Sequence, residues 1–199
     1  MPSKISYAVG VSLAAVFMIP GETMASTCDD GRSMTLEARK NLPDGIVETA
    51  ETPYHSFVIV KEGQRLFMRF RIRGYERNNQ SAIDLTQPEH LVFPYAQMFT
   101  LASVYVPKPQ SMLMLGVGGG TVSQYMHRHI KTMKVDAVEV DEGVLMCAKK
   151  YFGFQESENF KSHIQDGRVF LRRRKYEKYD IIYVDAFRAG YVPFHMLTK

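Results

Sequence analysis

The sequence predicts an α/β protein in which a doubly wound, mainly parallel sheet follows a small antiparallel β segment. Apolar, strand-like runs alternate with helix-like stretches from residue 111 onward, and this alternation implies a parallel sheet with crossover helices. Four glycines between residues 116 and 120 separate the first of these strands from a helix. Ahead of this region, residues 51–83 are rich in β-branched and aromatic residues, as expected of short antiparallel strands.

Composition places the chain among ordinary globular proteins. It has 199 residues, of which 45% are hydrophobic and 23% charged, which suits one main domain with a small appendage. The formal net charge of +4 is mild and its cations are dispersed, apart from a basic run at residues 172–175. That run lies where cations complement the end of a helix. We therefore expect no nucleic acid among the partners.

The two cysteines, Cys28 and Cys147, are too few for a disulfide framework. Cys147 lies in a helix-like stretch and is expected to be a small, buried apolar residue. In an oxidising compartment the two cysteines could pair, although no pattern in the sequence favours it. On the sequence alone their pairing stays open.

Residues 1–25 differ from the rest of the chain. Lys4 precedes an apolar run at residues 7–19, and small residues at Thr23 and Ala25 suit cleavage after Ala25. Because the run is short for a membrane span, a signal peptide is the first interpretation and an uncleaved N-terminal anchor the second. We expect a periplasmic, secreted or membrane-anchored protein, and a cytoplasmic one if the signal is not used.

Residues 26–85 form the expected N-terminal β segment. Residues 55–63 and 64–74 predict two strands joined by a tight turn. The character changes near residue 85, and residues 88–106 can carry a helix that is interrupted, or begins afresh, at Pro94.

Residues 86–199 carry the pattern of a Rossmann-like domain. The predicted strands and the helices between them are 111–117, 121–130, 135–140, 141–152, 161–167, 167–176 and 179–187. Such a sheet binds ligands at the carboxyl ends of its strands. A doubly wound sheet normally continues further, so C-terminal strands are expected to be missing, and the product is either short or a fragment.

The glycine-rich loop lies between the first of these strands and its helix. It contains Gly116, Gly118, Gly119 and Gly120, and the lack of Cβ atoms lets a ligand approach backbone amides. The dinucleotide fingerprint requires a glycine at the position of Thr121. The remaining G-x-G-x-G spacing is associated with S-adenosylmethionine sites. The alternative is that the glycines only let helix and strand pack closely.

Acidic residues follow the next two strands. Glu139 stands at the distance from the glycines where a carboxylate accepts the hydroxyl protons of a ribose. Asp141 is expected to be the N-cap of the following helix. Asp166 and Gly167, after the third strand, suit an adenine amino group, although Asp-Gly is also an ordinary turn and helix-start signal.

Together, the motifs MLGVGGG, VEVDEGVLMCAKKYF, QDGRVFL and YDIIYVDAF resemble the spermidine synthase (polyamine aminopropyltransferase) family, which has the S-adenosylmethionine-dependent methyltransferase type of fold. The likeness covers roughly Tyr54 to the end. It implies that Asp185 assists an acceptor amine and that Tyr95 lies on a helix beside the substrate. It also implies a nucleoside site formed by Gly116, Gly118, Gly119, Gly120, Glu139, Asp166 and Gly167.

Three positions depart from the family pattern. Thr121 stands where the family usually has an aspartate, Arg188 where it has a second acid, and His55 where it has glutamine. Two unit charges a few ångströms apart interact by about 4 kcal/mol at intermediate dielectric. We therefore expect Arg188 to disfavour a cationic diamine, and we assign Thr121, Arg188 and Tyr95 to an altered acceptor side.

The resemblance leads to two hypotheses on function. The first is a spermidine-synthase-like transferase that consumes decarboxylated S-adenosylmethionine or S-adenosylmethionine and needs no metal. It transfers an aminopropyl group, or as the second choice a methyl group, to a small-molecule amine or other acceptor. The alternative is a non-catalytic exported binding or structural module, with a homodimer through its N-terminal strands as a possible assembly. Export conflicts with the cytosolic origin of S-adenosyl compounds, so the compartment is decisive.

Overall fold

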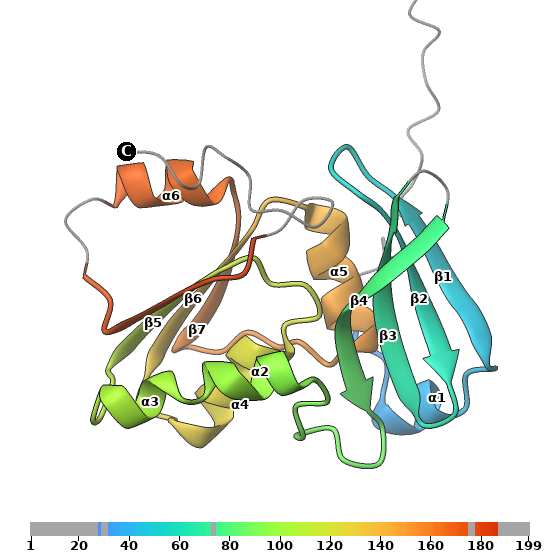
Figure 1. Ribbon diagram of the computed structural model, residues 1–199, viewed down its shortest axis with the longest axis horizontal. Helices are drawn as coiled ribbons and strands as arrows, with labels where there is room; N and C mark the ends of the chain where they lie inside the picture. The colour runs from blue at the N-terminus through green and yellow to red at the C-terminus, as the bar shows by residue number, and fades with distance from the viewer. Residues whose placement is uncertain (1–27, 29–31, 73–74, 175–177, 187–199) are drawn as a thin grey trace, which may run out of the picture.

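The computed structural model describes residues 28, 32–72, 75–174 and 178–186 of the chain. They form an antiparallel sheet and a parallel sheet with helices, which lie side by side (Figure 1). The predicted export or anchor segment, residues 1–25, lies outside the described residues. None of the helices within the described ranges is long and apolar enough to cross a membrane.

The antiparallel sheet belongs to the N-terminal part of the chain. A short helix precedes it, and its strands follow in the order β1-β2-β3-β4. The bounds are α1 (Leu36–Lys40), β1 (Gly45–Glu51), β2 (Ser56–Glu62), β3 (Arg65–Ile72) and β4 (Tyr75–Asp84). The predicted strands at residues 55–63 and 64–74 are confirmed as β2 and β3. Strand β1 escaped prediction because Ala50 is its one buried residue, which leaves no alternation of apolar and polar residues.

The second part of the chain forms the predicted α/β layer. Its elements are α2 (Pro94–Phe99), α3 (Ala102–Tyr105), β5 (Ser111–Leu115), α4 (Thr121–His129), β6 (Lys134–Glu139), α5 (Glu142–Tyr151), β7 (Phe160–Ile164), α6 (Gly167–Arg173) and β8 (Ile181–Val184). The strand order is β7-β6-β5-β8 and every described pair is parallel. The chain therefore reverses its direction of winding at β5, and ligands of such sheets bind outside the carboxyl ends of the strands at this point.

Strand β5 is the centre of the core. Met112, Leu113, Met114 and Leu115 are all buried, as expected of a parallel strand covered on both faces. The two methionines pack in the same apolar cluster as Met126 of α4, whereas the leucines pack with Phe170 of α6. Burial on both faces explains why this strand reads as a continuous apolar run and why it could be located from the sequence.

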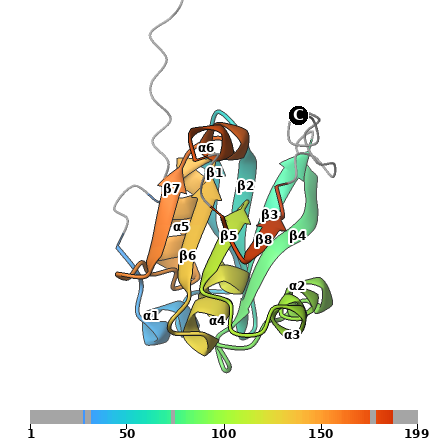
Figure 2. The same ribbon diagram turned by 90° about the vertical axis from the view of Figure 1, so that its left-hand side faces the viewer.

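Helix α5 lies between the two sheets (Figure 1 and Figure 2). Its residues Val144 and Tyr151 share an apolar cluster with residues of the antiparallel sheet such as Phe57. A disulfide joins Cys147 of this helix to Cys28, and both cysteines are buried. The pairing that the sequence left open is therefore formed, because the fold brings two residues 119 positions apart into contact.

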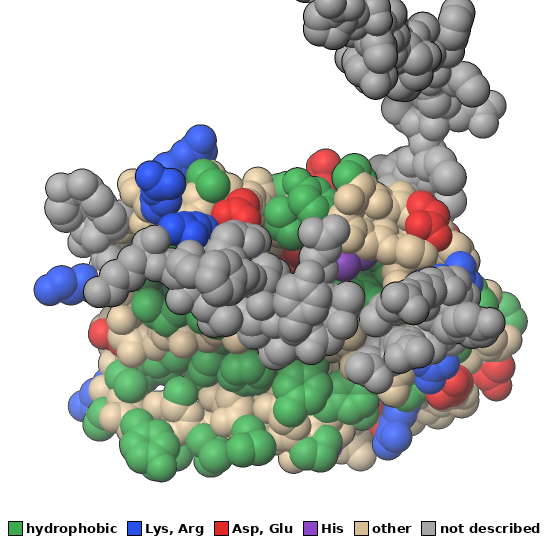
Figure 3. Space-filling model, turned by 45° about the horizontal axis from the view of Figure 1, so that its top comes forward, with side chains coloured by type: hydrophobic (Ala, Val, Ile, Leu, Met, Phe, Trp, Pro, Cys, Tyr) green, Lys and Arg blue, Asp and Glu red, His purple; other side chains and the backbone are tan. Residues whose placement is uncertain are grey.

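Helices α2 and α3 carry an exposed apolar face. Its members, each more than half exposed, are Met98, Leu101, Val104 and Tyr105. Hydrophobic side chains gather on this side of the molecule (Figure 3). Contiguous apolar surface of this kind is uncommon on monomeric proteins. The predicted homodimer through the N-terminal strands stays a prediction.

Candidate functional site at the carboxyl edge of the parallel sheet

The glycine-rich loop connects β5 to α4 in a backbone conformation that favours glycine. Gly116, Gly118 and Gly120 have φ angles of 88°, 54° and 72°, in the left-handed region that other residues rarely adopt. The amide of Gly116 donates to the carbonyl of Val138 at 2.9 Å. The loop therefore turns sharply at the carboxyl edge, next to the end of β6.

Protein atoms occupy much of the space that the missing side chains leave. A Cβ atom on Gly119 would lie 2.8 Å from Ser81 Cβ, and one on Gly120 would collide with the ring of Phe154. The amide of Gly119 donates to Ser81 Oγ at 2.7 Å. Close packing, the alternative that the sequence left open, thus accounts for these two glycines. The contact of these two glycines with a nucleoside stays a prediction. Ser81 is a neighbour of the loop that no sequence motif predicted.

Gly116 lies against the end of β8. A Cβ atom there would collide with the backbone carbonyl of Asp185, and the amide of Asp185 donates to Leu115 O at 2.8 Å. The glycine therefore lets the predicted catalytic aspartate approach the loop. The fold brings together two motifs that lie almost 70 residues apart in the sequence.

Glu139 points toward the glycine-rich loop. Its Oε2 accepts a hydrogen bond from the amide of Val117 at 2.9 Å, and Oε1 accepts from the amides of Val140 at 2.9 Å and Asp141 at 3.1 Å. Burial raises the pKa of Glu139, and the amides of Val117 and Asp141 oppose that rise. A carboxylate has about four lone-pair directions, and backbone amides use three of them here. A contact of Glu139 with a ribose stays a prediction.

Asp141 caps helix α5, as the sequence predicts. Its Oδ1 accepts from the amides of Gly143 at 3.0 Å and Val144 at 3.4 Å. Its Oδ2 lies 2.8 Å from His55 Nδ1 and accepts from Thr52 Oγ1 at 2.6 Å. The aspartate thereby joins the turn between β1 and β2 to the carboxyl edge of the parallel sheet.

His55, the position that departs from glutamine in the resemblance, is held on two sides. Its ring stacks on Phe70 with centroids 4.4 Å apart, in addition to its contact with Asp141. The pairing could not be predicted, because 86 residues separate the two partners.

Asp166 begins helix α6. Its Oδ1 accepts from the amide of Val169 at 3.0 Å, and Gly167 is the first residue of the helix. The helix-start role that the sequence offered as an alternative is therefore present. A contact of Asp166 or Gly167 with adenine stays a prediction.

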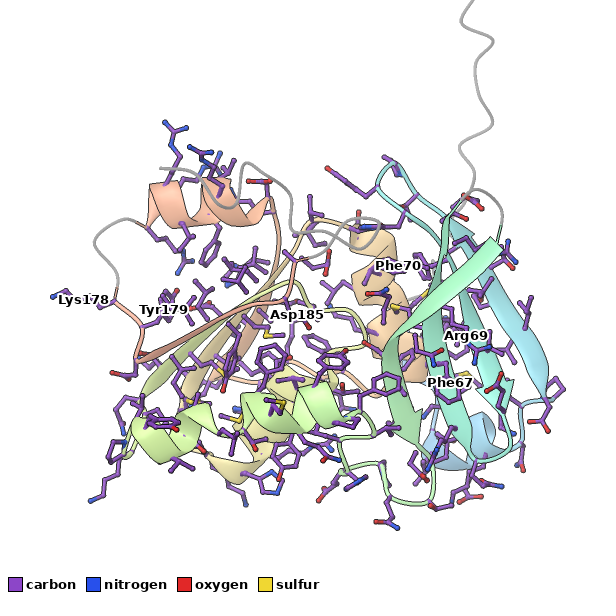
Figure 4. All side chains as sticks on the ribbon, in the orientation of Figure 1. Phe67, Arg69, Phe70, Lys178, Tyr179 and Asp185 are labelled. Atoms are coloured by element: carbon purple, nitrogen blue, oxygen red, sulfur yellow. A yellow bond between two sulfur atoms is a disulfide. The ribbon has the colours of Figure 1, made fainter. Side chains whose placement is uncertain are left out.

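Asp185 lies directly after β8, between the two sheets (Figure 4). Burial raises the pKa of its carboxyl to about 6, which suits a general base near neutral pH. Burial also raises the pKa of Tyr95 to about 12, with the charge of Asp185 as the second cause. The Tyr95 hydroxyl donates to Gln80 O at 2.7 Å, so this tyrosine ties α2 to β4 close to Asp185.

The two remaining acceptor-side candidates are placed differently. Thr121 is the first residue of α4 and lines a small cavity with Ile83, Leu91 and Gln124. Arg188 lies outside the described residues. Within the described ranges, no three His, Cys, Asp or Glu side chains gather closely enough to hold a metal ion.

Residues 93–192 match the family model described as the spermine/spermidine synthase domain, which is just over half of the chain. The chain belongs to the spermine/spermidine synthase family. The four motifs that carry the resemblance all lie within the matched residues.

Individual relatives agree with this assignment. The chain is 31% identical over 156 residues to the polyamine aminopropyltransferase of Vibrio vulnificus (strain CMCP6), covering 77% of this chain and 52% of that protein. Thus the chain spans about half the length of this curated relative.

Two solved structures share the fold. A probable spermidine synthase from Corynebacterium glutamicum ATCC 13032 superposes with a TM-score of 0.62 at 19% identity, covering 76% of this chain and 55% of that chain. A spermidine synthase in complex with the transition state analogue AdoDATO gives a TM-score of 0.59 at 21% identity, covering 77% of this chain and 51% of that chain. At these identities the comparison establishes the fold of the described residues and nothing finer.

Proposed function

We propose that this chain is an aminopropyltransferase unit that binds an S-adenosylmethionine-type nucleoside at the carboxyl edge of β5 and β6. The observation that carries the proposal is the hydrogen bond from the Val117 amide to Glu139, which holds the carboxylate at the glycine-rich loop. Family membership and the AdoDATO complex of a spermidine synthase of the same fold support it. Decarboxylated S-adenosylmethionine is the proposed donor.

The chemistry is a substitution at the carbon next to a sulfonium. The lone pair of a neutral amine forms the new C–N bond, the C–S bond breaks, and the electron pair stays on sulfur in the departing thioether nucleoside. The amine must lose one proton, and Asp185 accepts it because its raised pKa of about 6 lies close to neutral pH. Glu139 holds the ribose and thereby fixes the distance between donor carbon and acceptor nitrogen.

The acceptor is proposed to differ from a simple diamine. Binding a dication requires acids, and Arg188 stands where the resemblance implies one. We expect Arg188→Asp to raise turnover of putrescine. An unchanged rate would show that this position does not line the acceptor site.

Binding titrations distinguish the transferase from the non-catalytic alternative. We expect calorimetry to detect decarboxylated S-adenosylmethionine in the wild type and to find binding weakened about tenfold in Glu139→Gln, since a charge-assisted hydrogen bond to the ribose is lost. Glu142→Gln, an exposed change in the first turn of α5, is the matched control. If neither decarboxylated nor ordinary S-adenosylmethionine gives binding heat with the wild type, the result would support the binding or structural module instead.

Analysis of the products formed with each nucleoside separates aminopropyl from methyl transfer.

We also propose that the chain matures in an oxidising compartment. The buried Cys28–Cys147 disulfide supports this, because disulfides form and persist mainly outside the cytosol. The pattern of residues 1–25 points the same way. Mass spectrometry of protein from intact cells should find a chain that begins at Ser26 and lacks free thiols. A chain that includes Met1 and two alkylatable cysteines would contradict export.

A further inference from the structure

A groove lies beside helix α1, near the C-terminal ends of α4 and α5. It has a volume of about 380 Å³, within the range of about 300–1,000 Å³ that small-molecule sites occupy. Its walls come from α1, the segment after β4, the last turn of α4 and the segment after α5. The glycine-rich loop lies at the opposite, N-terminal end of α4. None of the glycines of the loop and neither Glu139 nor Asp185 lines the groove, although Phe152 in its wall also packs against Gly119.

Arg39 forms one wall of this groove and is only 8% exposed. Its guanidinium donates to two backbone carbonyls, that of Tyr151 at 3.3 Å and that of Thr35 at 3.5 Å. Among the described residues, no carboxylate lies within ion-pair distance of it. A buried cation without a counter-ion is unfavourable, so an anion bound in the groove would stabilise Arg39.

Arg128 provides a second cation. It lies on α4 and lines the same groove. Its nearest described acid is Glu89, at a long 3.9 Å, and the Glu89 side chain is 72% exposed. Burial lowers the pKa of Arg39, and the charge of Arg128, which lines the same groove, lowers it further. The groove thus carries two arginines and one loosely paired, solvent-exposed carboxylate.

Gly153 keeps the buried guanidinium in place. Its φ angle is 71°, and a Cβ atom there would lie 3.1 Å from Arg39 NH1. A larger residue would therefore both strain the backbone and press on the arginine. The groove is preorganised by a glycine that the sequence motifs did not single out.

We propose that this groove binds a compact anion of the phosphate type between Arg39 and Arg128. Guanidinium groups bind such oxyanions through paired N–H donors in a fixed plane. A carboxylate has two oxygens, which one guanidinium can satisfy, whereas a phosphate group offers enough oxygens for two. The ligand is either inorganic phosphate itself or the terminal phosphates of a phosphorylated molecule.

Calorimetric titration of the full chain with inorganic phosphate and with pyrophosphate tests the proposal and separates the two sources. Tighter binding of pyrophosphate points to a phosphorylated molecule, and equal affinity points to free phosphate. In Arg128→Gln we expect affinity to fall about tenfold, because one charge-assisted pair is lost. Arg172→Gln, in the exposed last turn of α6, removes the same charge outside the groove and should bind like the wild type.

Arg39→Lys provides the second test, since it keeps the charge but removes the planar pair of donors. We expect a loss of similar size in anion affinity. Melting curves of each variant show whether α1 still packs on α5. The proposal is overturned if neither anion gives heat with the wild type, or if Arg128→Gln and Arg172→Gln bind equally. Titration of the same variants with decarboxylated S-adenosylmethionine should give wild-type affinity, which keeps this result independent of the proposed transferase site.

Discussion

The two ends of helix α5 are fixed in different ways. At its N-terminal end, Asp141 caps the helix and also contacts Thr52 and His55, so every oxygen of this acid is used by the protein. At its C-terminal end, backbone carbonyls receive the bonds: the amide of Met34 donates to Lys150 O at 3.0 Å, and Arg39 donates to Tyr151 O. At the first end the oxygens of an acid accept the hydrogen bonds, whereas at the second end a buried arginine that lines a groove donates to a backbone carbonyl.

This difference shows which parts of a site a local sequence motif can predict and which it cannot. The N-terminal end lies inside one strand-turn-helix unit, residues 134–151, whose acids are visible in the sequence. The C-terminal end is bound by residues in and just before α1, and 112 positions separate Arg39 from Tyr151. The roles of the acids at the N-terminal end could be predicted from their spacing in the sequence. The role of Arg39 at the C-terminal end could be inferred only from the fold.

The largest expected effect comes from the disulfide that joins Cys28 to the middle of this helix. Removing it in a Cys28→Ala, Cys147→Ala double variant should lower the free energy of unfolding by about 4 kcal/mol, because a long loop of the unfolded chain is no longer closed. Urea unfolding of oxidised wild type, reduced wild type and the double variant measures this. Equal stability of the oxidised and reduced wild type would contradict it.

The next effect tests whether packing accounts for the glycine-rich loop. Gly120→Ala should cost about 3 kcal/mol, because it combines a left-handed backbone with a collision against Phe154. Gly63→Ala is the matched control: its φ of 57° is similar but its Cβ would meet nothing within 4 Å, so about 1 kcal/mol is expected. Equal losses in the two variants would mean that the backbone, and not packing, requires the loop glycine.

A smaller effect is expected at the capped end of α5. Asp141→Asn keeps a side chain that can cap the helix but loses the charge that faces His55, and should cost about 2 kcal/mol. Combining it with His55→Gln in a double-mutant cycle isolates the pair. Additive losses would show that His55 and Asp141 do not stabilise each other.

The smallest effect depends on pH. The pKa of Asp185 is raised to about 6 in the folded protein, above the value of about 4 in an unfolded chain. The stability associated with its protonated form is therefore complete below about pH 4 and is lost as the pH rises to about 6. Asp185→Asn should be more stable than the wild type by about 1 kcal/mol at neutral pH, allowing for solvent screening, and should lose the aminopropyl transfer that we propose. A stability difference that does not change with pH would contradict the raised pKa.

The sequence predicted the parallel half of the molecule better than the antiparallel half. Strand β5 is buried on both faces and is followed by glycines, so strand, loop and α4 could be located together. Strand β1 and the five-residue α1 carry no comparable pattern. The position of β1 is set by its antiparallel pairing with β2, and that of α1 by its contacts with the end of α5; no periodicity encodes either.

The candidate site was predicted in outline for the same reason. Glu139 and Asp141 follow from a strand that ends where a helix begins, and the structure places both there. Ser81, His55 and Arg39 act through partners tens of residues away. The contacts of these three residues are known only from the three-dimensional structure.

The bridge between Cys28 and Cys147 also sets an order of events during biosynthesis. The first thiol is made 119 residues before its partner, so it must wait until the ribosome has completed α5. During that interval the antiparallel strands can pair without the bridge. Until Cys147 has been synthesised, Cys28 is a lone thiol that an oxidant could join to another protein.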